Sequence, residues 1–265
     1  MKNDPFANHG IEHLSAFSIN LFIQSPAMWY INYLKGIRGD TNAAMIRGQV
    51  TEEAGEEAIK NNTPVYKSIE TATKEYKDRI KTLKKEKLLN ADEVKEKKEL
   101  ENLPQFVTHA VAHYNRLGKA EYQEKIEYHP DWSPVPILGY CDMVFHEEGI
   151  VRDLKTTAKK PSEITDSINR QLSIYSTALD GYVPLVDYIV VNQSRQEVIT
   201  MEVNDVDKWI SQVKGAVLAI QSLLSLGDLN EIASVIYPDL SLWIFNDEKQ
   251  IAEAKKIWSI KLFNF

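Results

Sequence analysis

The chain has 265 residues, of which 43% are apolar and 26% charged, a balance that suits a folded protein with a sizeable core and argues against disorder. Its net charge of -7 is unexpected for a nucleic-acid binder, although an enzyme that gathers carboxylates around a metal can keep its basic residues in local patches. The single cysteine, Cys141, excludes an intramolecular disulfide and a metal site made only of cysteines. With no secretory signal and no apolar stretch of about 20 residues, we expect a cytoplasmic protein without a membrane segment.

The first part of the chain is predicted to be helical. Residues 1–13 are polar and irregular, and we expect a mobile lead-in. Apolar periodicity predicts helix from Leu14 to Gly36, divided at Pro26, because proline interrupts helical hydrogen bonding. Further helices are predicted over residues 43–61, 69–89 and 91–117.

From Glu121 the apolar pattern becomes that of strands. Three short strands separated by turns are predicted over residues 121–128, 137–145 and 150–154, and they form a β-meander. A helix over 162–179 and a hairpin of two strands at 186–192 and 197–203 follow, and helices are expected at 205–226 and 248–257.

These elements predict one α/β domain with a central mixed sheet flanked by helices. Its parts would be a helical portion covering one side of the sheet, a catalytic sheet with its helix, and C-terminal helices, over residues 14–120, 121–203 and 204–265.

The strongest chemical signal is Asp142, followed after ten residues by Asp153-Leu-Lys155. Side chains two apart on a strand share a face, so Asp153 and Lys155 should project together, and Asp142 on the preceding strand could reach the same point. Two carboxylates can hold Mg²⁺, and a lysine can orient a water and stabilise the charge that develops on a phosphate. Burying such charges is costly unless they are paired or bind something.

These residues resemble the PD-(D/E)xK nuclease superfamily, within its RecB-like and phage-exonuclease branch. The resemblance implies a restriction-endonuclease-like core in which Asp142 and Asp153 ligate the metal, the carbonyl of Leu154 adds a further ligand, and Lys155 is catalytic. Gln171 and Tyr175 resemble the Gln-x-x-x-Tyr motif of RecB-type nucleases, and residues four apart share a helix face.

The resemblance also extends upstream, where Arg47-Gly-Gln-Val-Thr-Glu52 is similar to the family's first motif. Many members carry histidine where this chain has Glu52, and a carboxylate can ligate Mg²⁺ directly. Glu52 is therefore expected to be a third metal ligand, although its neighbour Glu53 could be mistaken for it and a place on the helix surface stays open. Ser25 stands where iron–sulfur members have a cysteine, so no such cluster is expected.

By the same analogy, contacts with DNA phosphates are expected from Ser15, Ser18 and Arg47. The basic patch that begins at Lys155 adds Lys159 and Lys160 as expected DNA contacts. The lysine-rich run from Lys77 to Lys98 fits a DNA-binding patch and a solvated helix face equally well. His109 and His113, four residues apart, are expected to be structural. No glycine-rich phosphate loop is present, so no nucleotide cofactor is expected.

We therefore expect a Mg²⁺-dependent DNA exonuclease, with Mn²⁺ able to substitute, acting in phage or bacterial recombination, repair or DNA degradation and located in the host cytoplasm if phage-encoded. Partners could include further copies of the chain and a recombination or single-strand-annealing protein. An endonuclease of the same superfamily would have the same site, and a non-catalytic DNA-binding protein is the alternative from another class.

Overall fold

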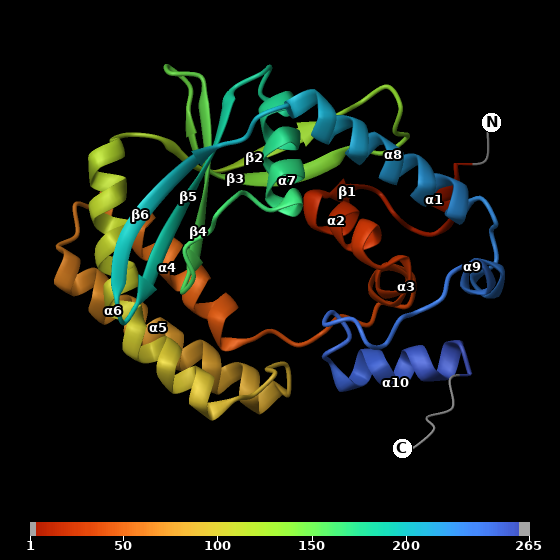
Figure 1. Ribbon diagram of the computed structural model, residues 1–265, viewed down its shortest axis with the longest axis horizontal. Coiled ribbons are helices and arrows are strands. Elements are labelled where there is room, and N and C mark those ends of the chain that lie inside the picture. The colour runs from red at the N-terminus through yellow and green to blue at the C-terminus, as the bar shows by residue number, and fades with distance from the viewer. Residues whose placement is uncertain (1–3, 260–265) are drawn as a thin grey trace.

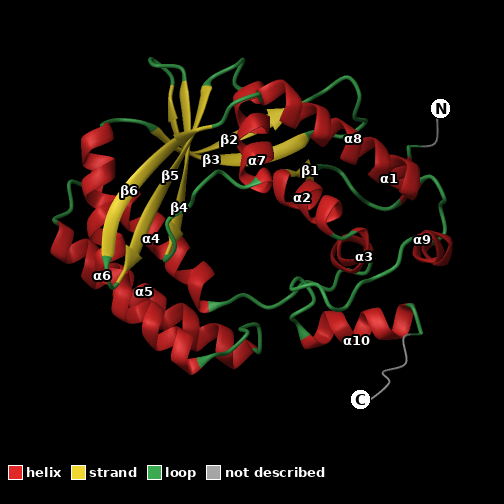
Figure 2. Ribbon diagram, viewed as in Figure 1, coloured by secondary structure: helices red, strands yellow, loops and turns green. Residues whose placement is uncertain are grey.

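A six-stranded mixed sheet lies between two groups of helices in the computed structural model, which describes residues 4–259 (Figure 1). The strands are β1 (Leu14–Ser15), β2 (Glu121–Tyr128), β3 (Ile137–Phe145), β4 (Ile150–Thr157), β5 (Val183–Asn192) and β6 (Arg195–Glu202). Their order is β1-β3-β4-β5-β6, and β2 also pairs with β3. Pairing is parallel for β1–β3 and β4–β5 and antiparallel elsewhere, which confirms the predicted mixed sheet and β-meander (Figure 2).

Strand β3 pairs with three other strands, and the gap in its pairing lies where Asp142 is. β2 runs along one edge of β3, whereas the other edge pairs with β1 at Ile137 and Leu138 and with β4 at residues 143–145. Within the described chain, residues 139–142 have no strand partner on that second edge. Beyond Arg152, β4 pairs only with β5, so β3 and β4 separate at Asp142 and leave a fork in the sheet.

The helices cover both faces of the sheet. They are α1 (Pro5–Asn8), α2 (Ala16–Gln24), α3 (Pro26–Trp29), the π-helical turn η1 (Tyr30–Leu34), α4 (Ala43–Lys60), α5 (Val65–Glu86), α6 (Glu93–Leu117), α7 (Asp166–Ala178), α8 (Val206–Leu224), α9 (Leu229–Val235) and α10 (Glu248–Ile257). Helix α6 packs on β5 and β6, and helices α4 and α5 pack against α6. Helix α7 packs on the opposite face of the sheet, where it contacts α2 and α8 (Figure 1). Within the described residues, no helix is long and apolar enough to cross a membrane.

Local sequence explains where these helices begin. The Asn42 side chain accepts a hydrogen bond from the Met45 N–H at the start of α4, and Asp92 does the same for Lys95 at the start of α6. Pro26 occupies the first turn of α3, where its missing N–H costs nothing, and Ser25 caps that helix. The predicted break at Pro26 is therefore correct.

Several boundaries differ from those predicted. Residues 5–8 form α1, and Phe6 is fully buried in the core, so the expected irregular lead-in is wrong for this described part; residues 1–3 of it lie outside the described chain. Helix α5 begins four residues early, because Pro64 acts as its N-cap rather than only ending the previous helix. Helix α9 and the two-residue β1 were not predicted, and residues 260–265 of the predicted C-terminal part lie outside the described chain.

Candidate active site

Strand β4 places Asp153 and Lys155 on the face of the sheet that carries α7. Leu154, between them, packs on the opposite face against α6 residues such as Phe106, as strand alternation requires. Asp153 is fully buried, and its Oδ2 lies 2.5 Å from Nζ of Lys155, whose side chain is 36% exposed. Asp153 and Lys155 therefore share one face of the sheet, as predicted, with the Asp153 carboxylate buried and the Lys155 ammonium nearer to solvent.

Asp142 joins this pair across the fork in the sheet. Its Oδ2 accepts a hydrogen bond from the backbone N–H of Leu154 at 2.7 Å, which links β3 to β4 where the strand ladder has stopped. Burial, together with the charges of Asp153 and Glu52, raises the pKa of Asp142 well above its ordinary value. Three carboxylates thus lie close enough to repel one another.

Glu52 reaches the same point from α4. Burial and the nearby charge of Asp153 raise the pKa of Glu52 to about 7. Its Oε1 accepts a hydrogen bond from Nε2 of Gln123 on β2. Neighbouring Glu53 instead forms an ion pair with Arg79 at 2.7 Å on the exposed side of the helix, so of the two glutamates only Glu52 faces the aspartates.

The Gln171 amide extends the site from α7. Its Nε2 donates to Oδ1 of Asp153 at 3.0 Å and lies 3.1 Å from the Tyr175 hydroxyl, one helical turn away. Gly139 on β3 makes room for the Tyr175 ring, since a Cβ at that position would lie 2.6 Å from Tyr175 Cε1. Gln171 is thus the residue of the motif that contacts Asp153, Tyr175 contacts Gln171, and Gly139 makes room for Tyr175.

The charge on Lys155 follows from its neighbours. Burial alone would lower the pKa of Lys155, but Asp153 and Asp142 outweigh this effect and raise it above the ordinary value. Lys155 is therefore a cation at neutral pH. In this state it can donate hydrogen bonds and stabilise negative charge, but it cannot act as a base.

The donor set fits a hard divalent cation. Oδ2 of Asp153 is buried, and its close partner is the ammonium of Lys155. Burial, and after it the charges of the neighbouring carboxylates, raise the pKa values of Glu52 and Asp142, and a bound cation would offset that mutual repulsion. Residues 4–259 contain no preformed group of three or more His, Cys, Asp or Glu side chains in metal-holding geometry. A cation would have to displace Lys155 from Asp153 and draw the carboxylates together.

The residues predicted to contact DNA lie in three different settings. Ser15 and Ser18 cap α2 reciprocally, each hydroxyl accepting a hydrogen bond from the other's backbone N–H. Arg47 is buried, donates to the carbonyl of Thr156 at 3.2 Å and pairs with Glu99 at 3.0 Å. Lys159 and Lys160 are exposed in the segment after β4.

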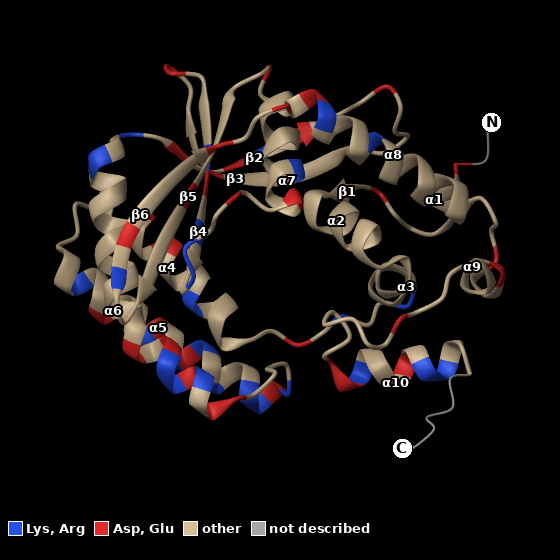
Figure 3. Ribbon diagram, viewed as in Figure 1, with Lys and Arg blue, Asp and Glu red and all other residues tan. Residues whose placement is uncertain are grey.

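The lysine-rich run over residues 77–98 is balanced by acidic residues. Figure 3 shows acidic and basic residues interspersed along α5. Several of these lysines form ion pairs, among them Lys84 with Glu96 at 2.7 Å and Lys95 with Asp92 at 3.2 Å. This favours the interpretation of the run as a solvated helix face.

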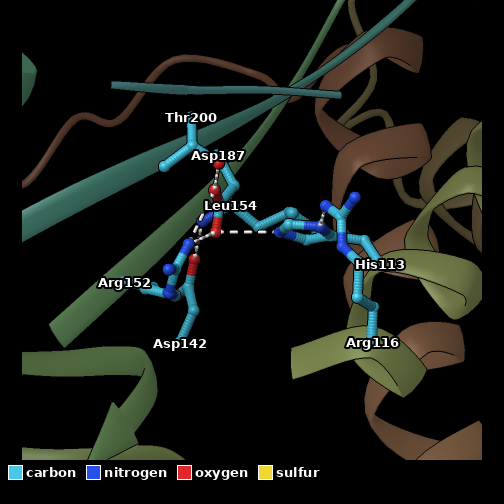
Figure 4. A network of polar contacts seen from close by, with 7 residues as sticks. All are labelled: His113, Arg116, Asp142, Arg152, Leu154, Asp187 and Thr200. Carbon is cyan, nitrogen blue, oxygen red and sulfur yellow. Dashed lines mark hydrogen bonds and ion pairs between the residues drawn. The ribbon is translucent and has the colours of Figure 1, made fainter. Parts of the chain in front are cut away.

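A buried polar network on the opposite face of β4 was not predicted. Asp187 on β5 is fully buried and accepts two hydrogen bonds from Nη1 of Arg152, at 3.0 and 2.9 Å, and one from Thr200 at 2.5 Å. His113 of α6 lies 3.0 Å from the same carboxylate (Figure 4). Burial would raise the pKa of Asp187, but His113, Thr200 and Arg152 together hold it below its ordinary value.

Two further neighbours of the site also escaped sequence reasoning. Gln123 bonds to Glu52. The buried Tyr114 hydroxyl has no hydrogen-bond partner among the described residues, and burial, together with the charges of nearby Asp142 and Glu52, raises the pKa of Tyr114. No motif or spacing marks either residue. Sequence alone would have found them only if the register of β2 on β3 and the docking of α4 had been known.

Comparisons with known proteins identify the family. A search of curated proteins found no match. A search of solved structures matched one described as "Crystal structure of SSO0001", with 14% sequence identity and a TM-score of 0.34, covering 84% of this chain and 94% of that chain. The family model of the PD-(D/E)XK nuclease superfamily matches residues 13–223, which include every residue of the site described above. The chain therefore belongs to the PD-(D/E)XK nuclease superfamily.

Proposed function

We propose that this protein is a Mg²⁺-dependent DNA exonuclease. The observation that carries the proposal is the convergence of three acidic side chains and one lysine, Glu52, Asp142, Asp153 and Lys155, at the fork between β3 and β4. A structural role alone gives no reason to bring three carboxylates together, because their mutual repulsion costs stability. Membership of a nuclease superfamily supports the same conclusion.

Glu52, Asp142 and Asp153 would hold the cation, and the carbonyl of Leu154 is a further candidate ligand. When bound, Mg²⁺ supplies Lewis-acid polarisation of the phosphate and a water of lowered pKa, and Mn²⁺ is expected to substitute. The remaining chemistry belongs to the protein's own side chains.

Lys155 has the clearest role of its own. Its cationic ammonium, partly exposed above Asp153, is suited to orient the attacking water and to stabilise the negative charge that develops on the phosphate oxygens. Gln171, on α7, donates a hydrogen bond to Oδ1 of Asp153, so it fixes the orientation of that carboxylate. Tyr175 lies beside Gln171 and supports it.

DNA would be bound around this site by groups that contact its phosphates. The exposed Lys159 and Lys160, in the segment that follows β4, are the best placed of the predicted contacts. Arg47 and Ser18 are buried. For these two residues and for Ser15, a role in stabilising α2 and α4 is better supported than contact with DNA. Further copies of the chain or a recombination partner would act by delivering DNA ends.

The experiment compares linear duplex DNA with covalently closed circles of the same sequence, each with Mg²⁺ and with EDTA. The proposal expects the linear DNA to be degraded with Mg²⁺ only and the circles to stay intact. Cleavage of the circles would replace the exonuclease by an endonuclease of the same superfamily. Absence of cleavage of either DNA would favour a non-catalytic DNA-binding protein.

A further inference from the structure

Strand β2 contains one residue with a backbone conformation that is unusual inside a strand. Gln123 has a φ of +54°, in the left-handed region that residues with a Cβ rarely adopt. Its neighbours Tyr122 and Glu124 pair with Met143 and Cys141 of β3, so Gln123 stands opposite Asp142 in the ladder. A conformation of this kind persists only where surrounding interactions compensate for it, and such positions cluster at functional sites.

Core packing does not explain this conformation. Gln123 is exposed, and it lies within the strand rather than in a turn. Among the described residues, its side chain makes one hydrogen bond, from Nε2 to Oε1 of Glu52. The contact joins the middle of β2 to a residue of α4 that lies far earlier in the chain.

The bond matters because Glu52 shares the site with two other acidic side chains, for which Lys155 is the neighbouring cation. Asp142 and Asp153 lie on the site side of the Glu52 carboxylate, and a flexible glutamate on a helix can relieve repulsion from them by turning outward to solvent. An amide that donates to one carboxylate oxygen opposes this movement and leaves the second oxygen, Oε2, for another partner. Outer groups that orient ligands in this way are part of many metal sites.

We propose that Gln123 is a positioning residue, which holds the Glu52 carboxylate toward Asp142 and Asp153 so that the three can bind a divalent cation. The inference rests on the proposed function, because it assigns Gln123 to the metal site of the nuclease. The strained backbone at Gln123 is then the cost of aiming its amide at Glu52.

The test measures Mn²⁺ binding to the full chain without DNA, by electron paramagnetic resonance of free Mn²⁺, together with the thermal unfolding midpoint of the metal-free protein. Gln123→Met keeps the length and the strained backbone but removes the donor, whereas Gln123→Gly removes the donor and also the strain. Both variants are expected to bind Mn²⁺ at least about tenfold more weakly than the wild type. Gln123→Gly should unfold at the same temperature as the wild type or higher.

Lys87→Gly is the matched control, since Lys87 also has a left-handed backbone, with a φ of +57°, but caps α5. It should bind Mn²⁺ like the wild type. If both Gln123 variants bound Mn²⁺ within twofold of the wild type, the role of Gln123 would be overturned and the proposed function would stand. The role would also be overturned if both variants bound Mn²⁺ more weakly and both unfolded at a correspondingly lower temperature. Absence of Mn²⁺ binding by the wild type would overturn the proposed function and the assignment with it.

Discussion

Asp142 on β3 accepts a hydrogen bond from the backbone N–H of Leu154 on β4, at 2.7 Å, at the point where the two strands separate. The carboxylate thus takes the place of a backbone hydrogen bond between the two strands. Because Asp153 and Lys155 flank Leu154, the bond also fixes their positions relative to Asp142. One side chain is both a candidate ligand and a structural link. Its two roles can be separated by substitution.

Asp142→Asn should separate these roles, because the amide oxygen can still accept from Leu154 while the charge is lost. We expect this variant to be at least as stable as the wild type, because the repulsion from Asp153 and Glu52 is relieved, and to lose Mg²⁺-dependent DNA cleavage. Asp142→Ala should lose cleavage too, and it should be less stable than Asp142→Asn by about 1–3 kcal/mol, because the Leu154 N–H is left without an acceptor. Urea unfolding and a nuclease assay on the same preparations check both statements, and equal stability of the two variants would argue against the structural role.

The pH dependence of stability should report Glu52. Its pKa of about 7 in the folded protein lies above the ordinary value of 4.5, so the folded metal-free protein keeps a proton that the unfolded chain has lost. The proton on Glu52 stabilises the folded state, and this contribution is complete below the ordinary pKa of 4.5. It is lost as the pH rises through about 7, which lowers the free energy of unfolding by roughly 3 kcal/mol. Unfolding of wild type and Glu52→Gln between about pH 4.5 and 8 measures it; parallel pH profiles of the two proteins would contradict the shift.

Gly139→Ala tests the close contact between β3 and α7. The added Cβ would lie 2.6 Å from the ring of the buried Tyr175, so we expect destabilisation by about 1–3 kcal/mol and slower cleavage as Gln171 moves from Asp153. Gly215→Ala in α8 is the matched control, since nothing lies within 4 Å of its new Cβ. That variant should be as stable as the wild type or more so, and a Gly139→Ala variant that behaves like it would refute the contact.

Asp187→Ala probes the buried network on the α6 face. It leaves Arg152, whose side chain is 13% exposed, and the buried His113 without their shared carboxylate. We expect a loss of about 3–5 kcal/mol in unfolding free energy. Glu197→Ala, which removes the exposed partner of Arg195, should cost less than about 1 kcal/mol. Similar losses for the two variants in urea unfolding would mean that the buried network contributes no more than a surface pair.

Part of this site could be predicted because it depends on short-range geometry. Asp153 and Lys155 share a face by strand alternation, and Gln171 and Tyr175 share one by helical spacing. Both pairs are together in the structure. Lys155 forms an ion pair with Asp153, and Gln171 donates to Asp153 and to the Tyr175 hydroxyl. The order of β2, β3 and β4 was also predictable, because short turns between strands favour a meander.

The remaining contacts depend on tertiary packing, for which the sequence has no local signal. Asp187 collects partners from α6, β4 and β6, and no spacing within one segment predicts such a meeting. The left-handed backbone of Gln123 arises in a stretch whose residues read as an ordinary strand. The two-residue strand β1 is too short to have a period, and it forms only because β3 offers it an open edge.

In the function that we propose, Asp153 and Lys155 are essential for metal-dependent cleavage of DNA. The most direct test of this function is the rate at which linear duplex DNA is degraded in Mg²⁺ by the wild type, Asp153→Ala and Lys155→Ala, with Glu53→Ala as a control from the exposed side of α4. We expect each of the first two variants to cleave at least about a hundredfold more slowly, while the control keeps the wild-type rate. Undiminished cleavage by either Asp153→Ala or Lys155→Ala would contradict it.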